Sequence, residues 1–267
     1  MKKLGYGIYS KKQNIILHIS IILFFIFIFT PLVCLFFDAI NFTLLLLIYL
    51  SLFLLSFVVL FFSNPFLKIQ SKLNKTANVN EYIKSIDQLM CNNLDEESII
   101  NLKLNKVNVL FVINKEEARE LFDSIDKNMI TKKDLVKLYL RIAILNRINF
   151  LEFDEARKLI EELRVMQGIN NKMIDEIEMY IKILATKEMI PDIEKRLNRK
   201  TRLLFLNIVL ASNLMYYYLN RIDLIDEEAK NVMIEKAKYV NDLINEKNLG
   251  MILLENDSKY ILENYNK

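Results

Sequence analysis

Two long apolar stretches lie near the start of the chain, and regularly spaced apolar positions follow them. Residues 15–37 and 42–62 are almost free of charge, since residues 14–62 contain one acid, Asp38, and neither lysine nor arginine. Each stretch reaches the length of about 20 residues that a helix needs to cross a bilayer. Because a helix satisfies its own backbone polar groups in hydrocarbon, both stretches predict transmembrane helices.

The link between the stretches, residues 38–41, is about one helical turn long, which predicts an antiparallel hairpin. A cleaved signal peptide is the alternative for the first stretch, but its length and the second stretch that follows at once favour the hairpin. The positive-inside rule places both termini in the cytoplasm, and we expect an integral protein of a bacterial inner membrane. The lysines that set this orientation are Lys2, Lys3, Lys11, Lys12, Lys68, Lys72 and Lys75.

Beyond residue 78 the apolar positions recur every three to four residues, the spacing of one helix face. Several predicted helices begin at a side chain that can cap the first turn, such as Asp95, Asn114 and Thr131, and Gly168 is placed to end one. The predicted helices cover approximately residues 80–90, 95–113, 115–126, 132–147, 153–166, 170–187, 190–199, 201–220, 226–246 and 257–265.

A short motif is repeated in this helical part. The sequence Leu-Asn-Arg-Ile occurs at residues 145–148 and again at 219–222, each time before a short acidic link. A pair of acidic residues directly precedes each of Ala118, Ala156 and Ala229, and a weaker copy of the unit lies in the longer gap between Ala156 and Ala229. The spacing predicts units of about 35–38 residues, each a helical hairpin.

This layout resembles the tetratricopeptide repeat family, whose unit of about 34 residues is a pair of helices. The three alanines occupy the position where that family has a small residue, and Phe122 its aromatic position. The resemblance implies an all-α fold, in which the hairpin precedes an α-solenoid of degenerate tetratricopeptide-like hairpins. The expected domains are a basic segment (1–13), two transmembrane helices (14–37 and 42–62), a juxtamembrane segment with a linking helix (63–95) and the cytoplasmic repeat domain (96–267).

Composition argues against several kinds of chemistry. The chain has four glycines, too few for the phosphate-binding loops of P-loop or dinucleotide sites. His18 is the only histidine and is interpreted either as an interfacial residue or as a membrane site, so no histidine-dependent triad or zinc protease fits the helical part. We expect no enzymatic activity, no cofactor and no metal, although paired carboxylates alone do not exclude acid–base chemistry.

Stacked helical hairpins typically form a concave groove that holds a peptide or a helix of another protein. We expect Asn207, Asn213 and Tyr217 to line it, because polar groups and a tyrosine stand out on the apolar stretch 201–220. Two basic clusters are candidates for contact with anionic lipid: Lys68, Lys72 and Lys75, and Lys195, Arg196, Arg199, Lys200 and Arg202. The alternatives are topology-setting charge for the first cluster, and RNA binding or a solvated bend for the second.

These features favour a membrane-anchored scaffold that binds a protein or peptide partner through the groove and contacts membrane lipids. With a net charge of +3, composition gives no argument for nucleic acid. The alternative is a small membrane effector, such as a transporter subunit or a toxin-immunity protein, that acts through the hairpin itself.

Overall fold

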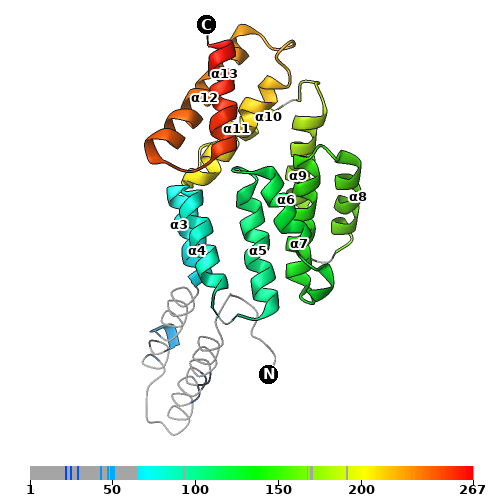
Figure 1. Cartoon of the computed structure of the whole chain (residues 1–267), viewed down its shortest axis with the longest axis vertical. Coiled ribbons are helices and arrows are strands. Elements are labelled where there is room, and N and C mark those ends of the chain that lie inside the picture. Colours follow the sequence, from blue (N-terminus) through cyan, green and yellow to red (C-terminus); the bar gives the residue numbers. More distant parts are fainter. Residues whose placement is uncertain are drawn as a thin grey trace.

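The computed structural model describes residues 65–266, except 93, 167, 169, 170 and 191, together with single positions scattered between residues 22 and 51. In this part of the chain every regular element is helical (Figure 1). The helices are α3 (Pro65–Thr76), α4 (Val79–Met90), α5 (Glu96–Leu110), α6 (Lys115–Asp123), the short 3₁₀ helix η1 (Lys127–Met129), α7 (Lys133–Asn149), α8 (Phe153–Arg164), α9 (Asn171–Ala185), α10 (Ile193–Leu197), α11 (Leu204–Leu219), α12 (Glu227–Lys247) and α13 (Ile252–Tyr265).

Local sequence explains where several helices begin. Asn78, Asp95, Asn114 and Asp226 precede α4, α5, α6 and α12, and each side chain accepts a hydrogen bond from the backbone N–H three residues later. These bonds satisfy N–H groups that a helix start leaves without an internal partner. The predicted helices match the observed ones closely, apart from α10, which has five residues where ten were predicted, and α13, which begins five residues earlier than predicted.

Consecutive helices pack as antiparallel pairs. The pairs α5–α6, α7–α8 and α11–α12 each share a face, α5 also packs on α7, and α9 contacts both α8 and α11. Ala118 in α6 and Ala156 in α8 are fully buried, whereas Ala229 in α12 is only partly buried. The likeness to tetratricopeptide repeats stays a prediction, since the helix that follows α9 is the five-residue α10 and helical pairs occur in many folds.

The two ends of the described region pack around one core. α3 packs on α11. The Val79 N–H at the start of α4 donates to the Leu249 carbonyl in the turn before α13 (3.0 Å), and the Leu253 N–H in the first turn of α13 donates to the Val112 carbonyl just after α5 (3.2 Å). Gly250, at φ 75°, lies in this turn so close to Asn80 that a Cβ atom would stand 2.3 Å from its Nδ2. The segment predicted as a linking helix thus shares one core with α11, α12 and α13.

The membrane prediction requires correction. Among the described residues no helix combines the length and the apolar character needed to cross a membrane. The strongly apolar α11 has 16 residues, and the longest helix, α12, carries charged residues along its 21 positions. This finding contradicts the predicted two-helix transmembrane hairpin and the predicted location as an integral inner-membrane protein with cytoplasmic termini. The segments 14–37, which contains His18, and 42–62 lie outside the described residues except at scattered positions.

Candidate functional site

The structure places Tyr217, one of the three predicted groove residues, inside the core. Its side chain is fully buried, and its phenol oxygen accepts a hydrogen bond from the Ile190 N–H at 2.8 Å. The same oxygen lies 3.8 Å from the sulfur of Met189. Tyr217 therefore anchors the segment before α10 from the core side, and its ring is not accessible to a partner.

Asn207 has a similar role at the other end of this segment. Its Oδ1 accepts hydrogen bonds from the N–H (2.8 Å) and the Oγ1 (2.9 Å) of Thr201, and its Nδ2 donates to the Thr201 carbonyl at 2.9 Å. One amide side chain thus satisfies three polar atoms of a single residue. Asn213 is half-buried on the same helix. The structure therefore does not bring the three predicted residues together as the lining of one groove.

A buried arginine holds the residues just before α10. Arg221 is 1% exposed, and its guanidinium donates to the carbonyls of Glu188 (2.7 Å), Ile183 (3.1 Å) and Lys182 (3.2 Å). Burial lowers the pKa of this guanidinium, and no carboxylate pairs with it in the described part of the chain. The last carbonyls of α9 carry the negative end of the helix dipole and so compensate the charge.

The segment between these anchors lies along α11 and carries one predicted basic cluster. Tyr217 and Asn207 are ten residues apart on that helix, about 15 Å at the rise of an α-helix. Between them, Ile193 and Leu197 of α10 point into the core, while the basic side chains are exposed. The exposed bases are Lys195, Arg196, Arg199, Lys200 and Arg202.

None of these five bases forms an ion pair within the described residues; Arg196 instead reaches the sulfur of Met179 at 3.7 Å. Two acidic residues, Asp192 and Glu194, lie beside these bases in the sequence. Glu194 accepts a hydrogen bond from Tyr218. Two apolar side chains flank the bases, Met189 (48% exposed) and Leu203 (39% exposed). We call these residues together the α10 surface: Met189, Lys195, Arg196, Arg199, Lys200, Arg202 and Leu203.

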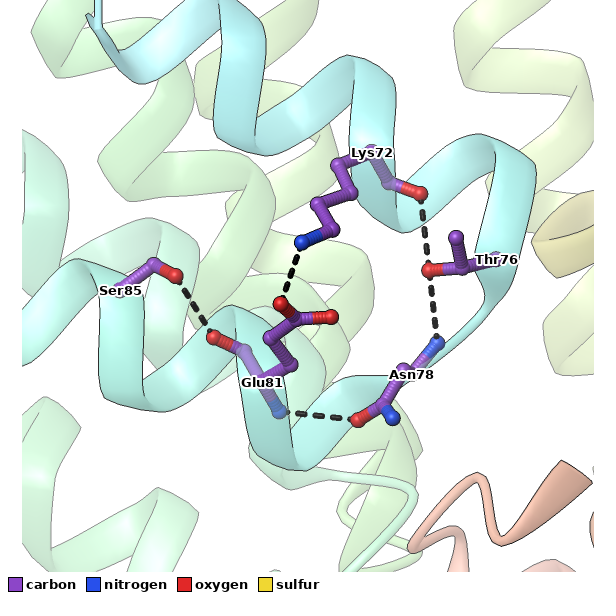
Figure 2. A network of polar contacts seen from close by, with 5 residues as sticks. All are labelled: Lys72, Thr76, Asn78, Glu81 and Ser85. Atoms are coloured by element: carbon purple, nitrogen blue, oxygen red, sulfur yellow. Dashed lines mark hydrogen bonds and ion pairs between the residues drawn. The ribbon is translucent and has the colours of Figure 1, made fainter.

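The other predicted basic cluster lies on α3, where Lys68, Lys72 and Lys75 are all exposed. Figure 2 shows that Lys72 reaches across the α3–α4 turn to form an ion pair with Glu81. In the same turn the Thr76 Oγ1 donates to the Lys72 carbonyl at 3.0 Å, and Asn78 caps α4 (Figure 2). Both members of the ion pair are well exposed, so it contributes little stability, and Lys72 is only partly available to a ligand.

The α3–α4 turn includes one residue in an unfavourable backbone conformation. Ala77 is fully buried and has φ 55°, in the left-handed region that side chains other than glycine rarely adopt. A shallow recess beside it, between Ile69, Leu73 and Tyr82, has about 10 Å³ of room, enough for one water molecule. This end of the molecule is best described as a tightly held turn and not as a ligand pocket.

One charged contact that sequence reasoning missed joins α5 to the start of α7. Oε1 of Glu97 accepts hydrogen bonds from the Thr131 N–H (3.0 Å), the Thr131 Oγ1 (2.7 Å) and the Lys132 N–H (3.1 Å). Burial alone raises the pKa of Glu97, but the hydrogen bonds from Thr131 and Lys132 outweigh it and lower the pKa to about 2. Thr131 is therefore not the cap of α7 that we predicted.

Comparison of the chain with protein-family models, with curated proteins and with solved structures finds no match. Among the described residues no group of three or more histidine, cysteine or acidic side chains is placed to hold a metal ion. The candidate site is therefore the α10 surface, where exposed basic and apolar side chains lie on a segment that is hydrogen-bonded to α11.

Proposed function

We propose that this protein is a scaffold that binds another protein or peptide, and that the α10 surface is where the partner docks. The observation that supports this most directly is a fixed backbone beneath exposed side chains. Ile190 and Thr201 are hydrogen-bonded to α11, while the apolar and basic side chains between and beside them extend to solvent. A surface that is already ordered loses less conformational entropy when a partner binds.

The mixture of side chains on this surface also favours a protein partner. Arginine and methionine are enriched at protein interfaces, where apolar contacts are surrounded by polar ones. Met189 and Leu203 provide exposed apolar contacts at the two ends of the basic segment. In this proposal Tyr217 and Asn207 contribute indirectly, because they hold the backbone of the surface from the α11 side.

The experiment uses the full chain with an affinity tag, exposed to a lysate of its source organism, with captured proteins identified by mass spectrometry. The test variant is Met189→Ser/Leu203→Ser. The matched control is Leu151→Ser/Leu224→Ser, which changes two exposed apolar residues at distant turns. We expect wild type and control to retain the same partner and the test variant to lose about tenfold in affinity.

Unfolding curves of both variants establish that the change lies at the surface and not in stability. The proposal fails if the wild-type chain retains no protein, or if the test variant and the control retain the partner equally well.

A further inference from the structure

We infer that the segment docking on the α10 surface is acidic, a short stretch of a partner protein with several Asp or Glu residues and apolar residues at its ends. This inference rests on the proposed function and adds the chemistry of the partner. Five cationic side chains occur within eight residues, and none of them has a carboxylate partner in the described part of the chain.

The arginines of the neighbouring hairpin provide a comparison within the molecule. Arg147, Arg157 and Arg164 each form an ion pair with a glutamate or aspartate, whereas the exposed Arg141 of the same hairpin forms none among the described residues. The arginines of the α10 surface have the same chemistry but are left without such a pair among the described residues. A guanidinium presents a planar fork that matches a carboxylate, so an acidic chain supplies what this surface lacks.

The arrangement of these arginines fits an extended chain. Arg196, Arg199 and Arg202 are spaced three residues apart on a segment whose two anchors are about 15 Å apart on α11. An extended strand covers that distance with about five residues. The partner segment therefore needs about five residues in contact with the bases, with apolar residues beyond them to meet Met189 and Leu203.

Nucleic acid fits this surface less well. Proteins that bind single strands without sequence preference stack bases on aromatic rings. Residues 189–203 contain no aromatic residue, and the tyrosines beneath them, Tyr217 and Tyr218, are buried. The surface thus offers charge but no stacking platform.

A lipid bilayer also fits less well. Helices that bind in the plane of a membrane insert an apolar face between the headgroups. The apolar residues of α10, Ile193 and Leu197, are buried against the protein core, so this helix has no apolar face to insert. Protein carboxylates remain the anionic groups that the observations favour.

The test uses the full chain and a fluorescent peptide of about five glutamates flanked by leucines, with binding followed by anisotropy. A peptide in which glutamine replaces each glutamate serves as the neutral reference. We expect the acidic peptide to bind at least about tenfold more tightly than the neutral one, and to weaken when salt rises from about 0.05 M to about 0.3 M.

The variant Arg196→Gln/Arg199→Gln/Arg202→Gln is expected to reduce this affinity by at least about tenfold. Its control, Lys158→Gln/Lys238→Gln/Lys247→Gln, removes the same charge from exposed bases of α8 and α12 and is expected to change it less than about twofold. Unfolding curves must show that both variants remain folded.

Three results would overturn the inference. The first is equal binding of the acidic peptide by the triple arginine variant and by its control. The second and third are tighter binding of a single-stranded RNA oligonucleotide, or of phosphatidylserine vesicles, that is lost in the arginine variant.

The inference and the proposed function fail separately. If a captured protein depends on Met189 and Leu203 but not on the arginines or on salt, the scaffold proposal stands and the acidic partner is wrong. If the acidic peptide binds but no protein is retained, the scaffold proposal fails while the charge preference of the surface stands.

Discussion

The two copies of the Leu-Asn-Arg-Ile motif end two helices, α7 and α11, in physically different ways. At the end of α7, Arg147 is partly exposed and pairs with Glu152 at 2.5 Å, while Arg119 binds the other oxygen of the same carboxylate at 2.9 Å. At the end of α11, Arg221 is buried and bonds to backbone carbonyls at the end of α9. The same four residues thus form a surface ion network once and a buried helix cap once.

The neighbouring residues explain the difference. Glu152 follows the first copy and binds both arginines, which lowers the pKa of its carboxyl, chiefly through the hydrogen bond from Arg147. Asp226 follows the second copy but is occupied as the cap of α12, with its Oδ1 accepting from the Ala229 N–H at 2.9 Å. Without a carboxylate, Arg221 is compensated by carbonyl dipoles.

The asparagines of the two motif copies also differ in their hydrogen bonds. Asn220 donates to the Ile183 carbonyl at 3.2 Å, which joins α11 to α9. Asn146 is 2% exposed, and its Oδ1 has no hydrogen-bond partner among the described residues. The comparison shows that a repeated motif does not ensure repeated contacts, because the helix packed against it decides which polar groups it meets.

The largest expected effect comes from removing the two arginines in turn. Arg221→Met removes charge-assisted hydrogen bonds to the carbonyls of Lys182, Ile183 and Glu188, and we expect a loss of about 3 kcal/mol in the free energy of unfolding. Arg147→Met breaks a partly exposed ion pair, and the expected loss is below about 1 kcal/mol. Urea unfolding of both variants measures the difference, and equal losses would contradict the distinction drawn between the two copies.

The starts of the two helices make a second contrast, which is expected to depend on pH. The charged Glu97 holds the residues before α7, whereas the neutral Asn207 holds those before α11. Because folding lowers the pKa of Glu97 from 4.5 to about 2, its contribution is present above pH 4.5 and is lost as the pH falls towards about 2.

We therefore expect Glu97→Gln to lose about 1 kcal/mol of stability at neutral pH and to show a weaker decline in stability on acidification than wild type. Thr131→Val removes one of the hydrogen bonds to this carboxylate and serves as an intermediate case. Thermal unfolding between pH 7 and about pH 3 measures both effects. An unchanged acid dependence in Glu97→Gln would show that another group is responsible.

The smallest expected effect concerns the residue that follows each motif copy by three positions. Leu151 is 64% exposed with φ 61°, whereas Ile225 in the equivalent place packs against the core and has no positive φ. Glycine adopts the left-handed region without steric cost, so Leu151→Gly is expected to raise stability by about 0.5 kcal/mol.

Ile225→Gly is expected to lower stability by at least about 1 kcal/mol, because it removes a packed side chain. Chemical unfolding of both variants tests this, and a loss in Leu151→Gly would mean that its exposed side chain stabilises the turn in the folded chain.

Much of the helical organisation could be predicted from the sequence, because helix ends depend on residues a few positions apart. Asp95 and Asn114 were recognisable as caps for this reason. Glu97 was not, since its partner Thr131 lies 34 residues later and only packing brings them together. The same limit applies to Tyr217, whose type suggested a binding groove but whose hydrogen-bond partner, Ile190, lies 27 residues earlier.

The apolar stretches show a different limit. Hydrophobicity and flanking lysines predicted a membrane hairpin, and no described helix has the length and apolar character to support it. Composition shows how apolar a segment is, but it does not determine which environment surrounds that segment.

By itself, the sequence determined the helical class of the described region, the positions of its helices and the exposed basic segment, because capping, periodicity and charge are local properties. The tertiary structure decided that α3 and α4 close onto α11 and α13, that Arg221 is buried while Arg147 is not, and that residues 190–201 are held as a surface. These outcomes depend on contacts between residues distant in the chain, which are settled only when the helices pack.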